Sequence, residues 1–378
     1  MRRLGTGAAR ARAATALLVV ILGTACGGSS PTAPGDAPLT PVATSAEWAA
    51  SSPEAEGLDP ARLTELVQRI RRAEFGQVES LLVVRNGRLA VEEYFGGGSL
   101  TAAHTMQSVT KSVVSLLTGI AVRKGLLRVE DRAAGFFVGY EPLANFDDRK
   151  AAITVRDLLT MRTGLDWSED AYQGSPLQLL NGCRCDWLRF VLDWRMREPP
   201  GTRWEYVSGG TILLGGLVGA AAGQRLDRFA EAELFGPLGV TGAFWIQGLP
   251  DGLPHGGGGL YLRSRDMAKL GQLVLDEGRY AGREIVQPAW IRESTRRVAT
   301  GVRVWAGQRF DYAYLWWLLD DKGGDIVTAA GAQGQFIFAV LRDRLVVVVT
   351  SNNDDARWVA PVGFLVSHIL PSIREPRR

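Results

Sequence analysis

Apolar, β-branched segments near both ends of the chain constrain its fold most strongly. The first pair, LLVV and LAVEEYF, flanks Asn86-Gly87, two residues that favour a tight hairpin turn. A second pair, QFIFAV and RLVVVV, flanks the turn over residues 341–344. The two hairpins predict an antiparallel sheet to which both ends of the chain contribute strands.

The middle of the chain, from about Arg132 to Trp245, has a different pattern. The segments VRDLLTM, WLRFVLDW, TILLGGLVGAA and LDRFAEAELF have helical spacing, and Pro199-Pro200-Gly201 and several glycine clusters interrupt them. We therefore predict an α+β fold, in which helices flank an antiparallel sheet and a helical lobe over about 132–245 is inserted.

Helix boundaries frame the folded part, which we expect over residues 53–378. Asp59 is a candidate N-cap, Pro60 fits the first helical position, and apolar residues then recur at helical spacing. The mostly apolar segment from Trp358 to Ile369 predicts a last helix. With 378 residues and 46% hydrophobic content, the chain is long enough to bury a sizeable core.

Residues 1–25 resemble a signal peptide, since a basic start precedes a short apolar run and small residues. A buried core helix or a wrongly assigned start codon is the alternative. Cys26 follows this segment and resembles the acylated cysteine of bacterial lipoproteins, although Leu22 lies one position too early, and cleavage after Ala25 without lipidation also fits. We expect export to the periplasm or cell envelope, a possible lipid anchor at Cys26, and a flexible linker over residues 26–52 that is rich in Pro, Ala, Ser and Thr.

Charge and cysteine content exclude several functional classes. Loss of the four arginines in residues 1–25 changes the formal net charge from +3 to −1, so no basic surface for nucleic acid is expected. Cys183 and Cys185 are too close for an unstrained disulfide, and we interpret them as packing residues. His104, His255 and His368 are widely scattered, so we predict neither a metal site nor a cofactor.

The segment MQSVTKSVVSLLTGIAVRKG carries the main chemical signal. Ser108 and Lys111 are three residues apart at the start of an apolar helix, which places them on one face. A poorly solvated lysine has a lowered pKa, so its neutral amine could accept the proton of Ser108 as the hydroxyl attacks. Chance spacing, with a surface serine and a solvent-reaching lysine, is the structural alternative.

Two further segments contain candidate site residues. Tyr206 could relay a proton between Lys111 and a leaving group while Ser208 provides a neighbouring hydrogen bond; a packed core tyrosine is the alternative. The amides of Ala332, Gln333, Gly334 and Gln335 could complete an oxyanion hole with the amide of Ser108, or the segment could be a plain glycine-rich turn. The glycine cluster from His255 to Gly259 is either a loop beside the cleft or an ordinary loop.

The trio SVTK, YVS and GAQGQ, in this order, resembles the serine β-lactamase and penicillin-binding-protein superfamily, in particular its class C-like branch of esterases and 6-aminohexanoate-dimer hydrolases. The likeness extends over nearly everything after residue 53. It implies a β-lactamase/transpeptidase-like fold, Ser108 as the acylated nucleophile, Lys111 as its general base and Tyr206 as the proton carrier. Ser208 would replace the Asn often found at its position.

One departure from the family pattern bears on the substrate. The third motif normally begins with Lys or His, which would bind a substrate carboxylate, and neither is present at Ala332-Gln333-Gly334. We therefore expect a serine hydrolase acting on a small ester or amide. The alternatives are a β-lactamase or D-alanyl carboxypeptidase, and a catalytically silent penicillin-binding-like lipoprotein. The oligomeric state is left open.

Overall fold

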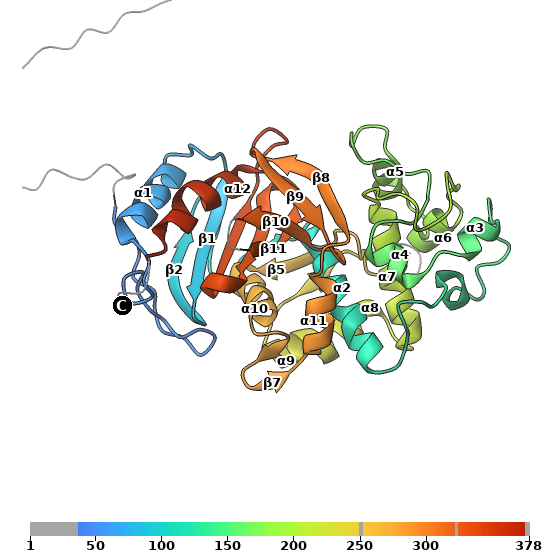
Figure 1. Ribbon diagram of the computed structural model, residues 1–378, viewed down its shortest axis with the longest axis horizontal. Coiled ribbons are helices and arrows are strands. Elements are labelled where there is room, and N and C mark those ends of the chain that lie inside the picture. Colours follow the sequence, from blue (N-terminus) through green and yellow to red (C-terminus); the bar gives the residue numbers. More distant parts are fainter. Residues whose placement is uncertain (1–36, 249–251, 322–323, 375–378) are drawn as a thin grey trace, which may run out of the picture.

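An eight-stranded antiparallel sheet forms one half of the molecule (Figure 1). The computed structural model describes residues 37–248, 252–321 and 324–374. The strand order is β2-β1-β13-β12-β11-β10-β9-β8, so strands from the two ends of the chain lie side by side. The strands are β1 (Val78–Arg85), β2 (Arg88–Tyr94), β8 (Ala299–Trp305), β9 (Gln308–Tyr312), β10 (Trp317–Asp321), β11 (Gly324–Gly331), β12 (Gln335–Val340) and β13 (Leu345–Ser351).

Both predicted hairpins are confirmed. Asn86 and Gly87 connect β1 to β2 with φ angles of 53° and 75°, the left-handed pair that a two-residue hairpin turn requires. Residues 341–344 connect β12 to β13, and Arg344 there has a φ of 49°. Antiparallel pairing of β1 with β13, with Val83 opposite Val347, joins the two hairpins into one sheet.

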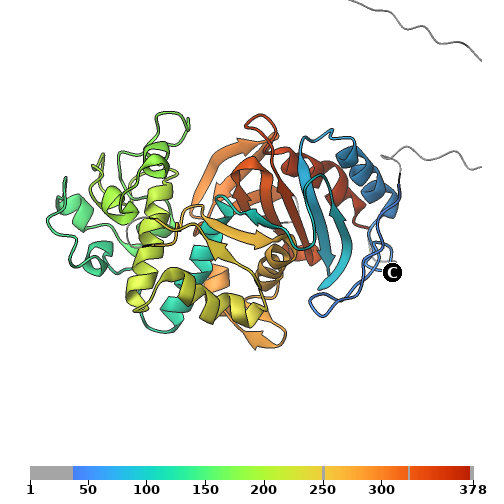
Figure 2. The same cartoon turned by 180° about the vertical axis from the view of Figure 1, so that it is seen from behind.

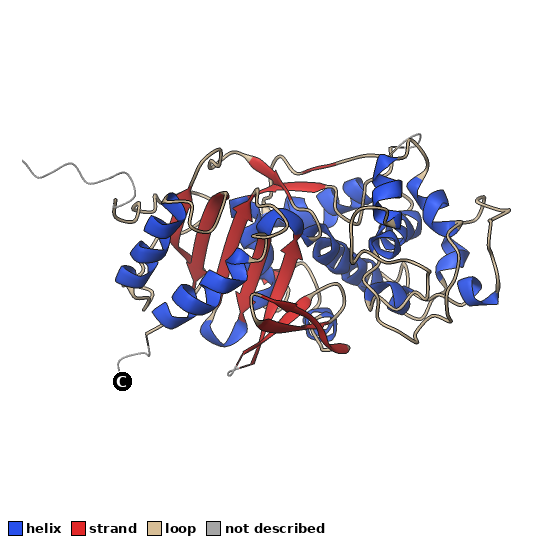
Figure 3. Ribbon diagram, turned by 90° about the horizontal axis from the view of Figure 1, so that it is seen from above, coloured by secondary structure: helices blue, strands red, loops and turns tan. Residues whose placement is uncertain are grey.

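Helices cover both faces of the sheet (Figure 3). Phe336 and Ile337 are successive residues of β12, so their side chains point to opposite faces of the sheet. The ring of Phe336 lies 6.0 Å from that of Trp358, near the C-terminal helices, whereas Ile337 contacts α10 at Gly271. The predicted first helix is confirmed, with Asp59 accepting a hydrogen bond from the amide of Ala61. These helices are α1 (Pro60–Arg71), α12 (Ala360–Phe364) with η5 (Leu365–Ile369) and η6 (Leu370–Ser372), and on the other side α2 (Val109–Arg123), α10 (Ser264–Leu275) and α11 (Pro288–Ser294).

A helical lobe forms the other half of the molecule (green in Figures 1 and 2). Its central helix, α7, is buried along most of its length and packs against α2, which in turn contacts the sheet at β11. The elements of the lobe are η1 (Ala133–Phe136), α3 (Asp148–Ala151), α4 (Val155–Leu159), α5 (Pro176–Gly182), α6 (Trp187–Leu192), α7 (Ser208–Ala221), α8 (Leu226–Ala230), η2 (Glu231–Phe235) and α9 (Gly236–Leu238). The architecture confirms the predicted α+β fold.

Short strands complete the structure around the junction of the two halves. A three-stranded sheet has the order β3-β5-β4, and its first strand leads directly into the turn before α2. Short 3-10 turns, η3 (Ala332–Gly334) and η4 (Leu341–Asp343), connect β11 to β12 and β12 to β13. The remaining strands are β3 (Ala103–Thr105), β4 (Phe244–Trp245), β5 (Leu260–Arg263), β6 (Arg279–Tyr280) and β7 (Arg283–Glu284).

A flexible linker was expected over residues 26–52, but the described part of this segment is packed against the rest of the protein. From residue 37 onward the segment packs on the sheet edge and on α10. Trp48 is only 5% exposed, the amide of Thr40 donates to the carboxylate of Glu93 over 2.6 Å, and Ser51 pairs with Leu89 of β2. Composition alone missed these contacts, which depend on the distant sheet. The predicted signal peptide and Cys26 lie outside the described residues.

The interpretation of Cys183 and Cys185 as unpaired packing residues is wrong, because their sulfur atoms form a disulfide. The bridge spans one residue between α5 and α6, where the extended backbone at Cys183 brings the two side chains to the same side. Among the described residues, no helix is long and apolar enough to cross a membrane.

Candidate active site

Helix α2 brings Ser108 and Lys111 together at the junction of the sheet and the lobe. Ser108 is the N-cap residue of the helix, and Lys111 lies one turn further on. The Nζ atom of Lys111 is 2.8 Å from the Oγ atom of Ser108. The helix N-terminus also directs its partial positive charge at the serine, which favours the negative charge that develops when the hydroxyl reacts.

Lys111 is held in surroundings that favour its neutral form. Its side chain is 1% exposed, and Nζ also donates to the carbonyl oxygen of Gly257 over 2.6 Å. Burial lowers the pKa of Lys111 to about 8, and the negative charge of Glu169 partly opposes this shift. With one N–H directed at the Gly257 carbonyl, the lone pair of the neutral amine can face Ser108.

Tyr206 lies beside both Ser108 and Lys111. It precedes α7 by two residues, and its ring centroid is 4.9 Å from the Nζ atom of Lys111. Burial raises the pKa of Tyr206 above that of an ordinary phenol, although a hydrogen bond with Ser108 lowers it in part. The hydroxyl therefore keeps its proton at neutral pH and can donate it to an atom bound beside Ser108.

Ser208 lies in the cleft, where it is hydrogen-bonded to Glu169, a residue that the sequence analysis missed. Both the amide and the hydroxyl of Ser208 donate to the carboxylate of Glu169, over 2.6 Å and 2.8 Å. The indole of Trp167 donates to the same carboxylate over 2.5 Å. Glu169 thus anchors the start of α7 to the loop before α5 and supplies the charge felt by Lys111.

The end of β11 approaches the amide of Ser108 very closely. A Cβ atom on Gly331 would lie 2.5 Å from the carbonyl oxygen of Met106 and 3.1 Å from the amide nitrogen of Ser108. Only glycine fits this position. The next residue, Ala332, is exposed in the cleft, so its amide is the better placed candidate to share an oxyanion with the amide of Ser108.

Gln333 lines the cleft, whereas Gly334 and Gln335 lie behind it. The side chain of Gln333 accepts a hydrogen bond from Gln107 over 2.9 Å, which ties the turn before α2 to the turn after β11. Both glutamines have positive φ angles, 44° and 64°, a strained conformation typical of functional sites. Gln335 is buried and donates to the carbonyl of Ser351, so the structure does not bring its side chain to Ser108.

The cleft around Ser108 has two arms. The first, which we call the glycine arm, has a volume of about 410 Å³ and is lined by Gly257–Gly259, Asn181, Trp187, Ile246 and His255. The second, the aromatic arm, has a volume of about 590 Å³ and is lined by Tyr206, Trp305, Trp317, Trp358 and Arg303. Both arms share the lining residues Gln107, Ser108, Leu177, Asn181 and Gln333. The cluster from His255 to Gly259 is therefore a loop beside the cleft.

Arg303 is a second cleft residue that the sequence analysis missed. Of the described residues that line the two arms, it is the only Lys or Arg. Its guanidinium is 3.0 Å from the carboxylate of Asp170 and lies 5.3 Å from the ring centroid of Trp204. The cleft thus holds a cation, but one that is paired with Asp170, and the carboxylates Glu169 and Asp355 line the same arm.

Comparisons with known proteins agree with this architecture. The Beta-lactamase family model matches residues 70–362. A 6-aminohexanoate-dimer hydrolase of Paenarthrobacter ureafaciens is 23% identical over 78% of this chain and 76% of its own length. EstCE1, a hydrolase with promiscuous acyltransferase activity, superposes with a TM-score of 0.68 at 16% identity, over 85% of this chain and all of that one.

A second solved structure has the same fold. The octameric penicillin-binding protein homologue from Pyrococcus abyssi superposes with a TM-score of 0.63 at 17% identity, over 82% of this chain and 77% of that one. The family match spans most of the sheet, the lobe and all residues gathered around Ser108. This chain therefore belongs to the Beta-lactamase family.

Proposed function

We propose that this serine hydrolase cleaves small esters or linear amides through a covalent acyl-enzyme on Ser108. The observation that carries the proposal is the 2.8 Å contact between Ser108 and a buried lysine whose pKa is lowered to about 8. The names of two similar proteins, a 6-aminohexanoate-dimer hydrolase and a hydrolase with promiscuous acyltransferase activity, fit the same substrate class.

Acylation follows from the geometry around Lys111. The neutral amine accepts the proton of the Ser108 hydroxyl while the oxygen attacks the substrate carbonyl carbon. The carbonyl oxygen then carries negative charge, which the amides of Ser108 and Ala332 stabilise. The Gly257 carbonyl holds the amine in place as it becomes a cation.

Collapse of this intermediate releases the alcohol or amine, which needs a proton. Tyr206 is close to both Lys111 and Ser108, so it can pass a proton from the lysine to the leaving group. Tyr206 lines the aromatic arm, and the residues described around the glycine arm do not include it. The leaving group therefore occupies the aromatic arm and the acyl group occupies the glycine arm.

Deacylation uses the same groups in reverse. A water molecule takes the place of the leaving group, gives up a proton toward Tyr206 and Lys111, and attacks the acyl carbon. The bond between this carbon and the Ser108 oxygen breaks, and the serine recovers its proton from Lys111. The products are a carboxylic acid and the free enzyme.

The lack of a Lys or His at Ala332-Gln333-Gly334 favours esters and linear amides over β-lactams and D-alanyl peptides, whose carboxylate a cation there would bind, and Arg303 of the aromatic arm is paired with Asp170. A β-lactamase or D-alanyl carboxypeptidase remains the second candidate, since a relative named as a D-alanyl-D-alanine carboxypeptidase from Escherichia coli is 26% identical over half of each chain. The third candidate, a silent binding protein, does not need the close Ser108–Lys111 contact.

One panel on one purified sample separates the candidates. We expect p-nitrophenyl esters and linear amides of 6-aminohexanoate to be hydrolysed faster than nitrocefin and a D-alanyl-D-alanine peptide. Ser108→Ala should lower kcat by about 10⁶-fold, the size of the effect when the nucleophile of a serine protease is removed. Fastest turnover of nitrocefin would support the β-lactamase candidate, and a complete lack of turnover would support the silent binder.

We also propose that the protein is exported and anchored by a lipid at Cys26. The order of basic, apolar and small residues over 1–25 supports this proposal. Expression in a lipoprotein-processing bacterium should give a product that partitions into detergent, and Cys26→Ser should abolish this partitioning. A wild-type product that stays in the aqueous phase would contradict the anchor.

A further inference from the structure

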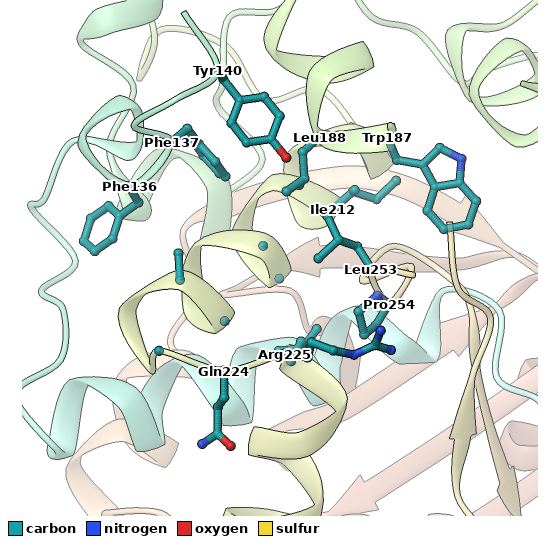
Figure 4. A pocket seen from close by; sticks show the side chains of 16 residues that line it. Phe136, Phe137, Tyr140, Trp187, Leu188, Ile212, Gln224, Arg225, Leu253 and Pro254 are labelled. Atoms are coloured by element: carbon teal, nitrogen blue, oxygen red, sulfur yellow. The ribbon is translucent and has the colours of Figure 1, made fainter. Parts of the chain in front are cut away.

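A second cavity lies behind the glycine arm, within the helical lobe (Figure 4). We call it the rear cavity; its volume is about 420 Å³. Its lining is mostly apolar and includes Phe137, Leu188, Ile212, Leu226 and Leu253, while Tyr140, Gln224 and Arg225 add polar groups. Besides Ile212, the face of α7 toward it is formed by the small residues Gly215, Gly216, Gly219 and Ala220, which leave the space that bulkier side chains would fill.

A thin wall separates the rear cavity from the glycine arm. Trp187 lines both spaces, and the consecutive residues Pro254 and His255 line one each. Ile212 lines the rear cavity, while a Cβ atom on Gly257, in the glycine arm, would lie 3.2 Å from the Ile212 side chain. The side chain of Trp187 is thus the largest group between the two spaces.

The indole of Trp187 is held firmly in this wall. The residue is 9% exposed, and its ring meets the ring of His255 edge-on with centroids 4.7 Å apart. On another side, a Cβ atom at Gly248 would lie 2.8 Å from the indole, so the backbone there packs directly against it. These contacts fix the indole as part of the wall that the glycine arm shares with the rear cavity.

We propose that Trp187 is a specificity-determining residue that limits the length of the acyl group, and that the rear cavity is the space a longer linear alkyl chain would enter without it. The inference rests on the proposed acyl-enzyme and on placement of the acyl group in the glycine arm. A short acyl group ends before the indole. A longer one meets the indole and is excluded from the apolar space behind it.

The test compares p-nitrophenyl acetate, butyrate and octanoate as substrates of the full chain and its Trp187→Ala variant. Each methylene that enters apolar surroundings raises kcat/KM about fourfold. The octanoate-to-acetate ratio of kcat/KM should therefore rise by at least about tenfold in Trp187→Ala if only two methylenes reach the rear cavity. Trp187→Phe, which removes less of the wall, should shift the ratio in the same direction by a smaller factor.

A blocking variant distinguishes entry into the rear cavity from general loosening. Ala220 is exposed and lines the rear cavity but is not among the residues described around the glycine arm. Adding Ala220→Phe to Trp187→Ala should cancel the gain for octanoate. Alone, Ala220→Phe should leave the wild-type ratio unchanged. Thermal unfolding of each variant checks that it is folded.

Two outcomes would overturn the inference. One is an unchanged ratio in a folded, active Trp187→Ala or Trp187→Phe variant. The other is a gain for octanoate that persists in the double variant. Absence of any ester or amide turnover by the wild-type protein would instead count against the acyl-enzyme itself, so the two failures are distinguishable.

Discussion

Lys111 combines burial with a nearby negative charge, and this combination decides when it can act as a base. Burial destabilises the ammonium form, whereas the carboxylate of Glu169 stabilises it, and burial has the larger effect. The pKa of Lys111 is therefore lowered, to about 8, yet stays higher than it would be without Glu169. A base with this pKa is partly neutral at physiological pH.

A pH profile tests this balance. Activity requires neutral Lys111, so kcat/KM should rise with pH and level off above a pKa of about 8. Glu169→Gln removes the charge that raises the pKa of Lys111, so the rising limb should move to lower pH. The measurement is kcat/KM on one ester between pH 5 and 10.

Asp355→Asn is the matched control for this profile. Asp355 also lines the aromatic arm, but it is not among the charges that shift the pKa of Lys111. The rising limb of the Asp355→Asn profile should coincide with that of the wild type. A limb that moves to higher pH in Glu169→Gln, or equally in both variants, would contradict the assignment of Lys111 as the base.

At the scale of single residues, the sequence allowed the local pair to be predicted but not its surroundings. Ser108 and Lys111 are three positions apart on one helix, so their contact depends on helix geometry alone. Glu169 reaches Ser208 from 39 positions away, and Arg303 enters the cleft on an edge strand. Contacts of this kind form only when the lobe packs against the sheet. A local sequence pattern does not predict this packing.

Among the structural elements, the close approach of β11 to the start of α2 is the contact on which the site depends. Gly331 has an ordinary extended φ of −134°, so glycine is required there for space and not for backbone freedom. A methyl group would push β11 away from Met106 and Ser108, and with it the amide of Ala332.

Gly331→Ala is therefore expected to damage both stability and catalysis. Overpacking of this kind costs about 1–3 kcal/mol of unfolding free energy. Misplacement of a reacting group by about 1 Å can lower kcat on the order of 100-fold. Urea unfolding and ester kinetics on the same variant measure the two effects.

Gly363→Ala provides the control for this substitution. Gly363 lies within α12, and a Cβ atom there would meet nothing within 4 Å. The substitution should leave kcat/KM unchanged and stabilise the protein by about 0.5–1 kcal/mol. Equal kinetics for Gly331→Ala and the wild type would show that the close approach has no role in catalysis.

Elements with a strong local signal were predicted well, and those that depend on distant partners were not. The turn at Asn86-Gly87 and the cap at Asp59 follow from the conformational preferences of the residues themselves. The disulfide between Cys183 and Cys185 was missed because sequence spacing does not show which way an extended backbone directs the two side chains.

For the molecule as a whole, the two ends of the chain hold one another in place. Residues 37–52 contact β2 and α10, and α1 packs against the C-terminal helical segment η5. Glu47 pairs with Arg263 over 2.6 Å, at the start of α10, and Trp48 belongs to the main hydrophobic core. The fold class was predictable from the two hairpins, but the docking of this polar segment was not.

Truncation tests the contribution of the segment. A chain that begins at residue 53 loses the buried Trp48 and also Glu47, one of the two carboxylate partners of Arg263, so it should be at least about 3 kcal/mol less stable than one that begins at residue 37. Thermal or urea unfolding of the two chains gives the difference. Equal stability would show that residues 37–52 contribute nothing and would support the linker that composition suggested.

The most direct test of Ser108 as the nucleophile is to locate the covalent bond that the enzyme forms. The intact protein is treated with an alkyl fluorophosphonate, and the modified residue is identified by peptide mass spectrometry. We predict a single adduct on Ser108, formed faster as the pH rises through about 8 and absent from Ser108→Ala. An adduct on another residue, or equal labelling of Ser108→Ala, would contradict the assignment of Ser108 as the nucleophile.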